Sequence, residues 1–366
     1  ARRMPYAPSG SSLFWSGMNK GKKSIAVDMK SPDGKELISN LITAPGKDAG
    51  LFLTNLKVRG WLDYETLSKV RSDIIIVTLT GDRHGKPQVD YTVNPALGIP
   101  DITGLEGSTD PVANAIPAWD MIAGNMCVSS LLAAERYRLR HGVGQDVEIA
   151  LKDVASAAIG HLGMIADTTL NTDDRTKAGN SLYGAYGKDF LCADGNRVMI
   201  IGLTSRQWTG IVKATDTAEQ FKQLEMQNNI NLQDESIRWK WRHAITEIIE
   251  PWFKIRKVEE FASNFDKIGL TWSVFRSVRE ALDFDPDLTE DNPLFKKILQ
   301  PDAGEFLVPK HPANFSKVEN SDPTAAPILG EHTEEILGDV LNLSDIEVSN
   351  LFDNGVVASP SFYKNK

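Results

Sequence analysis

The feature of this sequence that most limits its possible folds is the stretch Asp73-Ile-Ile-Ile-Val-Thr-Leu79, an apolar run that follows Asp73 and contains a single threonine. Its length and its β-branched residues are typical of a strand buried on both faces, as in a parallel sheet. A second apolar run covers residues 50–54, and residues 64–70 between the two runs have helical character. Because parallel strands need such crossover helices, the sequence predicts an α/β fold with a parallel sheet and right-handed crossovers.

The rest of the chain extends this pattern and indicates two lobes. Residues 145–151 alternate as a further strand, whereas residues 189–201 are typical of a β-hairpin. A chain of 366 residues exceeds what one hydrophobic core comfortably supports. We therefore predict a discontinuous large lobe, with a smaller lobe inserted into it. Their predicted bounds are 1–188 and 306–366 for the large lobe, and 189–305 for the small one.

Composition argues against several classes of protein. The formal net charge is −9 and the basic residues are scattered, which argues against a general nucleic-acid binder. No apolar run approaches the ~18 residues of a membrane span, and no signal-peptide pattern opens the chain. The two cysteines, Cys127 and Cys192, form no CxxC pair. We expect a cytoplasmic protein with no metal site, no membrane partner and no nucleic-acid partner.

Standard nucleotide and hydrolase motifs are missing. The stretch Gly17-Met-Asn-Lys-Gly21-Lys-Lys-Ser24 looks like a phosphate-binding loop, but it has one residue too few between the glycines. No GxGxxG follows a strand, and the sequence contains no HExxH, EF-hand loop or GxSxG elbow. This argues against simple nucleotide-binding, zinc-protease and serine-hydrolase functions. Residues 82–116 are polar and rich in glycine and proline, and we interpret them as a long functional loop.

The stretch Pro117-Ala-Trp-Asp120 opens a helix that is predicted to end near His141. Asp120 lies in the first turn, where a carboxylate faces unpaired N–H groups and the positive end of the helix dipole. An ionised, oriented carboxylate can act as a nucleophile toward an activated acyl group. The simpler alternative is an acidic residue that only caps the helix, and the local pattern by itself favours that alternative.

Several short motifs follow one another along almost the whole chain. They are Lys23-Ser-Ile-Ala-Val-Asp-Met-Lys30, Asn55-Leu-Lys57, Tyr91, Pro117-Ala-Trp-Asp120, Tyr183-Gly-Ala-Tyr-Gly187 and Leu329-Gly-Glu-His-Thr-Glu-Glu-Ile-Leu337. In this order they resemble the family III CoA-transferases. The resemblance implies a Rossmann-like large domain with a parallel sheet, a smaller α+β domain and an interlocked homodimer. It also implies that the chain starts after the first strand–helix unit of the family.

The same resemblance implies roles for individual residues. Asp120 would attack the thioester carbonyl of an acyl-CoA, giving a mixed anhydride and then an enzyme–CoA thioester. A glycine loop would cover this aspartate, stabilise the oxyanion and exclude water. The implied loop residues are Tyr183, Gly184, Tyr186 and Gly187, and the implied CoA contacts are Lys30, Asn55, Leu56 and Tyr91. The CoA thioester is the substrate, so no cofactor is expected.

Within the family, the chain is most similar to members that move CoA between the two carboxyl groups of one mesaconyl-CoA molecule. The alternatives are transfer of CoA to a separate carboxylic acid, and a non-catalytic CoA-binding subunit. Two site residues also have structural alternatives to a ligand contact. Tyr183 and Tyr186 could pack in a hairpin, and Lys30 could be a solvated strand end.

Overall fold

The computed structural model of the chain describes residues 3–360, and by its contacts it divides into two compact units. Unit 1 contains the described residues of Ala1–Gln88, Asp120–Val154 and Glu280–Lys366. Unit 2 contains Val89–Trp119 and Ala155–Arg279. Both units are therefore built from separate stretches of the sequence. The two units do not have the bounds predicted for the lobes, which were 1–188 with 306–366 and 189–305. The division into those lobes stays a prediction.

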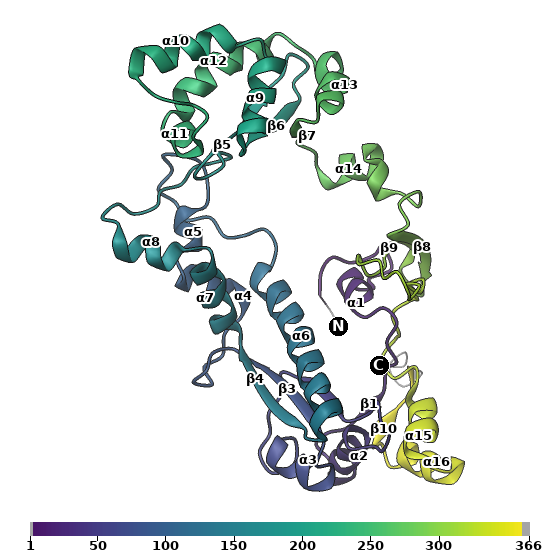
Figure 1. Cartoon of the computed structure of the whole chain (residues 1–366). Helices are drawn as coiled ribbons and strands as arrows, with labels where there is room; N and C mark the ends of the chain where they lie inside the picture. The colour runs from purple at the N-terminus through teal and green to yellow at the C-terminus, as the bar shows by residue number, and fades with distance from the viewer. Residues whose placement is uncertain (1–2, 361–366) are drawn as a thin grey trace. The chain divides into compact units, whose positions relative to one another are not determined.

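Unit 1 contains a parallel sheet of three strands, two of which carry labels in Figure 1. Its strands, in spatial order, are β2 (Leu51–Thr54), β3 (Ile75–Thr80) and β4 (Gln145–Ala150). Helix α3 (Tyr64–Val70) connects β2 to β3, and its Leu67 shares a buried cluster with Ile74 and Ile76. The side chains of Ile75 and Val77 are completely buried. The α/β class and the buried central strand predicted from the apolar run are confirmed.

The helices of unit 1 begin at capping residues that the sequence supplies. Helix α2 (Pro32–Ile42) starts with a proline, and the Ser31 hydroxyl accepts a 3.0 Å hydrogen bond from the Gly34 N–H. Asp63 caps α3 by accepting a 2.8 Å bond from the Thr66 N–H. Such caps satisfy backbone N–H groups that have no partner within the helix, and this fixes where each helix begins.

Helix α6 (Ala118–His141) is the longest helix among the described residues and runs from unit 2 into unit 1. It begins one residue after Pro117, as the proline predicts, and it ends at His141. Within unit 1 it buries one face, made by Ala123, Cys127, Ala134 and Arg138. The Arg138 guanidinium donates a 2.9 Å bond to the Ala49 carbonyl, just before β2. The C-terminal half of α6 is thereby fixed to the parallel sheet.

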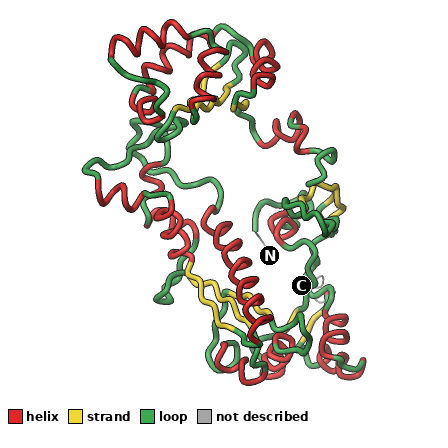
Figure 2. Tube along the Cα trace, viewed as in Figure 1, coloured by secondary structure: helices red, strands yellow, loops and turns green. Residues whose placement is uncertain are grey.

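The C-terminal part of unit 1 packs against its N-terminal part. Strand β1 (Ala26–Val27) pairs antiparallel with β10 (Val357–Ala358). The Trp15 indole of helix α1 (Leu13–Met18) donates a 2.8 Å bond to the Pro327 carbonyl. Residues 310–328 form an irregular connection, drawn in green in Figure 2, that leads from β9 toward α15. The other elements are η1 (Pro286–Leu288), β8 (Phe295–Gln300), β9 (Gly304–Pro309), α15 (Thr333–Leu341) and α16 (Asp345–Asp353).

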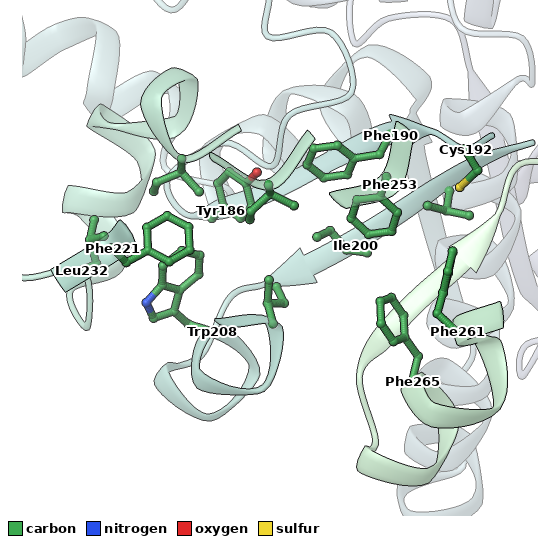
Figure 3. Close-up of a cluster of buried hydrophobic side chains, with 14 residues drawn as sticks. Tyr186, Phe190, Cys192, Ile200, Trp208, Phe221, Leu232, Phe253, Phe261 and Phe265 are labelled. Atoms are coloured by element: carbon green, nitrogen blue, oxygen red, sulfur yellow. The ribbon is translucent and has the colours of Figure 1, made fainter. Parts of the chain in front are cut away.

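Unit 2 contains an antiparallel sheet with the strand order β5-β6-β7, surrounded by helices. Its strands are β5 (Tyr186–Leu191), β6 (Arg197–Gly202) and β7 (Thr271–Val274). The core between sheet and helices is aromatic, and Figure 3 shows Phe190 next to Phe253. These two rings are stacked, and their centroids are 4.7 Å apart. The hairpin predicted at residues 189–201 is confirmed. The helices after the hairpin are α9 (Ser205–Ala214), α10 (Ala218–Asn228), α11 (Glu235–Lys240), α12 (Arg242–Lys254), α13 (Val258–Ile268) and, at the junction with unit 1, α14 (Val278–Phe284).

The interpretation of residues 82–116 as one long loop is wrong, because this segment contains two short helices. They are α4 (Asp90–Ala96) and α5 (Ile99–Ile102). The Thr92 hydroxyl accepts a 3.1 Å bond from the Val89 N–H at the start of α4, and Val93 is completely buried. Capping and burial therefore stabilise helices in this segment despite its high content of glycine and proline. Two further helices, α7 (Leu151–His161) and α8 (Met164–Leu170), follow β4.

None of the helices between residues 3 and 360 combines the length and the apolar character needed to cross a membrane.

Candidate active site

Asp120 lies in the first turn of α6, and its side chain is exposed. The chain enters this helix through a tight turn in which the Ala118 N–H donates a 2.9 Å bond to the Ile116 carbonyl. The positive end of the helix dipole favours the ionised form of a carboxylate at this position. An exposed, ionised carboxylate on a fixed helical turn is chemically suited to act as a nucleophile.

The residue before Asp120 is held by two side chains of α4. The Trp119 N–H donates a 2.7 Å hydrogen bond to Asp90 Oδ2, and the Trp119 indole N–H donates a 3.0 Å bond to Asn94 Oδ1. Asp90, Asn94 and Trp119 are all buried. Asp90 therefore caps the start of α6 from outside the helix. Together, Asp90 and Asn94 fix the position of Trp119, the residue directly before Asp120.

Sequence reasoning missed Asp90 and Asn94. Their spacing of four residues places them on one face of a helix, which is a usable signal only when residues 90–96 are read as helical. Tyr91, the CoA contact implied by the resemblance, lies on the same short helix and is exposed. Tyr91 belongs to unit 2, whereas Asp120 is grouped with unit 1.

The other three predicted CoA contacts lie in unit 1, on exposed turns after two strands. Asn55 and Leu56 follow β2, and the Thr54 hydroxyl accepts a 2.9 Å bond from the Leu56 N–H. Lys30 follows β1, and its N–H donates a 3.1 Å bond to Asp28 Oδ1. Carboxyl ends of parallel strands are the usual ligand sites of α/β sheets, and β2 presents Asn55 and Leu56 at such an end.

In unit 1, residues that follow Leu56 in the sequence line a cavity of about 1030 Å³. Lys57 pairs with Glu148, and this hydrogen bond is the main reason why the pKa of Lys57 is raised. Burial raises the pKa of Asp146 on the same side. Sequence reasoning gave no separate role to Lys57 of the Asn55-Leu-Lys57 motif or to Arg59, although two basic residues so close together are a signal for anionic ligands. The charged residues that line the cavity are Lys57, Arg59, Asp63, Glu65, Lys69 and Asp146.

The glycine loop is a tight turn in front of β5. The Leu182 N–H donates a 3.0 Å bond to the Gly187 carbonyl, and Ala185 N–H donates a 3.3 Å bond to the Leu182 carbonyl. Gly184 has a φ of +81°, which glycine adopts most readily, and open space surrounds the place of a β-carbon. The exposed part of this turn therefore consists of Tyr183 and Gly184.

The two later residues of the predicted loop belong to the sheet. Tyr186 is 1% exposed, and its hydroxyl lies 3.2 Å from Thr246 Oγ1. Burial raises the pKa of this phenol. Figure 3 shows Tyr186 among the side chains of the aromatic core. Gly187 lies next to it in β5, also buried. Hairpin packing, the alternative left open by the sequence, thus describes Tyr186, whereas Tyr183 stays accessible.

No group of three or more His, Cys, Asp or Glu side chains suited to a metal ion occurs in the part of the chain that the structure describes.

Comparison with known proteins gives consistent results. The family model described as CoA-transferase family III matches residues 1–333. The 2-methylfumaryl-CoA isomerase of Chloroflexus aurantiacus is 49% identical over 360 residues, which cover 98% of this chain and 88% of that protein. The succinyl-CoA:glutarate CoA-transferase of Mus musculus is 24% identical, with 96% of this chain and 79% of that protein covered.

Solved structures show the same fold. A CAIB/BAIF family protein from Brucella suis superimposes with a TM-score of 0.70 at 22% identity, covering 90% of this chain and 84% of that one. A protein from Mycobacterium tuberculosis superimposes with a TM-score of 0.71 at 19% identity, covering 90% of this chain and 86% of that one.

Proposed function

Because this chain belongs to CoA-transferase family III, we propose that it isomerises 2-methylfumaryl-CoA to 3-methylfumaryl-CoA by moving CoA within one molecule. The observation that carries this proposal is the 49% identity, across nearly the whole chain, to a 2-methylfumaryl-CoA isomerase. The chain is an enzyme of this family, and an acyl-CoA substrate is consistent with that membership. The choice of acyl group and the intramolecular route are the parts that need experiment.

In the proposed mechanism, Asp120 is the nucleophile. One carboxylate oxygen attacks the thioester carbonyl, the C–S bond breaks, and CoA leaves as a thiolate with a mixed anhydride left on Asp120. The thiolate then attacks the aspartyl carbonyl, so that the acyl group leaves as a carboxylate and an enzyme–CoA thioester forms. These covalent steps divide one difficult exchange into easier ones. Exposure of Asp120 in the first turn of α6 supports this role.

The second half of the mechanism reverses these steps at the other end of the dicarboxylate. The second carboxylate attacks the enzyme–CoA thioester and releases the thiolate, which attacks the acyl carbonyl of the new anhydride. This forms the isomeric thioester and returns Asp120 as a carboxylate. No proton is gained or lost overall. The turn at Tyr183 and Gly184 would exclude water during this sequence, since the anhydride is readily hydrolysed.

For CoA itself, we propose contacts with Lys30, Asn55, Leu56 and Tyr91. All four are exposed, so they are accessible to a ligand. The cavity that follows Leu56 adds Lys57 and Arg59, whose positive charges suit the phosphate groups of CoA.

We also propose a homodimer, because α6 presents an unusual number of exposed apolar side chains for a helix in the middle of a chain. A second copy that covers this face would remove them from water. The free cysteines, Cys127 and Cys192, fit the reducing cytoplasm that we propose as the location. The exposed apolar residues of α6 are Met121, Ile122, Met126, Val128, Leu132, Tyr137 and Leu139.

Transfer of CoA to a separate acid is the second candidate, since relatives at 24% identity include a succinyl-CoA:glutarate CoA-transferase. Purified enzyme incubated with 2-methylfumaryl-CoA and isotopically labelled free mesaconate distinguishes the two. The intramolecular route gives 3-methylfumaryl-CoA without label and without any need for added acid. Labelled CoA ester, or no isomer in the absence of free acid, contradicts it.

The covalent step has its own test. After rapid mixing with substrate, hydroxylamine should convert acylated Asp120 to a hydroxamate that mass spectrometry locates on the peptide containing Asp120. The D120A variant should carry no such modification. A hydroxamate on another residue, or full turnover by D120A, would show that the nucleophile is a different group. A protein that binds CoA but turns over no substrate would instead be the non-catalytic subunit.

A further inference from the structure

Tyr183, next to the exposed Gly184, is held in a stack of charged and aromatic side chains within unit 2. The Arg175 guanidinium lies 3.8 Å from the centroid of the Tyr183 ring. The Trp239 ring centroid lies 5.0 Å from that of Tyr183, with the two planes tilted by 59°. The Arg242 guanidinium lies 4.1 Å from the Trp239 ring centroid. Tyr183 is thus in contact with a cation and with a second ring.

The stack also has a fixed end. Arg242 Nη2 makes a 2.7 Å ion pair with Glu106 Oε1, and His243 Nε2 lies 3.3 Å from the same oxygen. Glu106 follows α5, Trp239 lies in the last turn of α11 and Arg242 begins α12. Glu106, Arg175 and the Trp239–Arg242 segment, which are distant from one another in sequence, therefore meet around the residue before Gly184.

Arg175 lies over the Tyr183 ring and also lines a cavity of about 480 Å³ in unit 2. Its guanidinium makes no ion pair with a carboxylate between residues 3 and 360, and it lies against the face of Tyr183. A cation over an aromatic face is attracted by the ring quadrupole, and the attraction grows where water is excluded. An arginine used in this way stabilises the position of one ring.

The Gly184 turn is held at both of its ends. Tyr186 is anchored in the aromatic core, and Tyr183 is anchored in the stack. Gly184 and Ala185 lie between these anchors, so the conformation of the turn depends on both. The Tyr186 anchor is part of the fold, whereas the Tyr183 anchor is at the surface and consists of side chains alone.

We propose that Arg175 and Trp239, supported by Arg242, are positioning residues for CoA transfer, which hold Tyr183 and thereby keep the Gly184 turn in the conformation that excludes water. This inference rests on the proposed function of Asp120 and of the turn. It assigns the stack no contact with the reacting atoms. Its chemical consequence is a low ratio of hydrolysis to transfer, because water competes with the thiolate and the carboxylate for the acylated enzyme.

The first test needs no activity. Chymotrypsin cleavage after Tyr183, followed by mass spectrometry under native conditions, reports how often the turn opens. R175A and W239A should raise the cleavage rate at this bond by about fivefold, the equivalent of about 1 kcal/mol at 25 °C. R175K and W239F keep a cation and a ring, so they should restore much of the protection. R256A is the matched control, because Arg256 lies 4.3 Å over the Trp252 ring elsewhere in the same unit.

The second test measures free mesaconate against isomerised ester during turnover. R175A and W239A should raise the ratio of hydrolysis to transfer several-fold, while R256A should leave it at the wild-type value. A role in general stability alone would lower both products together and leave their ratio unchanged. Ratios and cleavage rates that stay at the wild-type value in folded R175A and W239A overturn the proposal. Failure of the proposed function is separate, since wild-type protein would then give no isomer or no adduct on Asp120.

Discussion

Asp90 caps helix α6 by accepting a 2.7 Å hydrogen bond from the backbone N–H of Trp119, one residue before Asp120. The N–H at this position has no partner within its own helix. A buried carboxylate from a different helix satisfies it, and Asn94 of the same helix accepts the 3.0 Å bond of the indole. The start of α6 is therefore determined by α4 and by the sequence of the first turn together.

Two replacements of Asp90 should distinguish the contribution of its hydrogen bond to stability from that of its charge. D90A leaves the buried Trp119 N–H without its acceptor, so the free energy of unfolding should fall by about 1–3 kcal/mol. D90N keeps an oxygen acceptor and should lose less than half as much. Urea denaturation followed by tryptophan fluorescence measures both. Equal losses in the two variants would mean that charge, and not the hydrogen bond, is what Asp90 supplies.

Asp120 should be needed for turnover and not for folding. Its side chain is exposed, so the free energy of unfolding of D120A should lie within about 1 kcal/mol of the wild-type value. Loss of a covalent nucleophile should lower kcat by about 10³-fold or more. Steady-state formation of 3-methylfumaryl-CoA is the measurement, and circular dichroism is the control for folding. Activity of D120A within tenfold of wild type would contradict the assigned role.

Local sequence signals were enough for much of unit 1. The apolar run at 73–79 became β3, Ser31 and Pro32 start α2, and Pro117 precedes α6, because strand burial and helix capping depend on neighbouring residues. The α4–α5 segment was missed, since its helices depend on burial of Val93 and Asn94 by distant residues. The hairpin of β8 and β9 was also not foreseen.

The candidate site also has features that the local sequence predicts and features that it does not. The first-turn position of Asp120 followed from local pattern, whereas the contact of Trp119 with Asp90 joins residues 29 apart in sequence. A glycine–tyrosine repeat does not distinguish a core tyrosine from a surface one. Tyr186 is buried because β5 begins with it, and Tyr183 stays at the surface because the turn precedes the strand. Only the register of the hairpin decides between them.

Two glycines of the predicted loop should respond differently to substitution by alanine. A β-carbon on Gly187 would lie 2.7 Å from Ile201 Cδ1 and 2.8 Å from Leu182 Cβ, so G187A should lower the free energy of unfolding by about 1–3 kcal/mol. Gly184 has open space, and G184A costs only the strain of its positive φ, about 1 kcal/mol. Thermal unfolding measures this order, and a more destabilised G184A would contradict the register of β5.

Both cysteine thiols should be unreactive in the folded protein. Cys127 and Cys192 are buried, and burial raises the pKa of Cys127 and that of Cys192, the latter to about 11. Because the thiolate is the reactive form, a disulfide reagent such as DTNB at pH 7.5 should modify neither thiol within minutes. Both should react after denaturation in guanidinium chloride. Rapid modification of Cys192 in native protein would indicate that the end of β5 opens.

Asp189 should make the stability of the β5–β6 hairpin depend on pH. Its carboxylate is 8% exposed, is hydrogen-bonded by Arg197 and lies 3.3 Å from the Lys188 ammonium. Burial is the largest single influence and opposes ionisation, but the combined bonds from Arg197, Asn180 and Lys188 lower the pKa of Asp189 overall. A lowered pKa in the folded state means that the unfolded chain binds the proton more readily. The stabilisation is therefore present above the unfolded pKa of about 3.9 and is lost as the pH falls further.

The D189N variant measures this contribution directly. At pH 7 it should be less stable than wild type by about 1–2 kcal/mol, because the amide cannot replace the charged hydrogen bond to Arg197. As the pH falls below about 3.9 the difference between the two proteins should shrink, because Asp189 is then protonated in the unfolded wild-type chain and folding must release that proton. D173N, which removes an exposed carboxylate from the same unit, should show no such convergence. Urea midpoints determined at each pH give the comparison, and a difference that stays constant down to pH 3 would mean that the folded hairpin does not lower the pKa of Asp189.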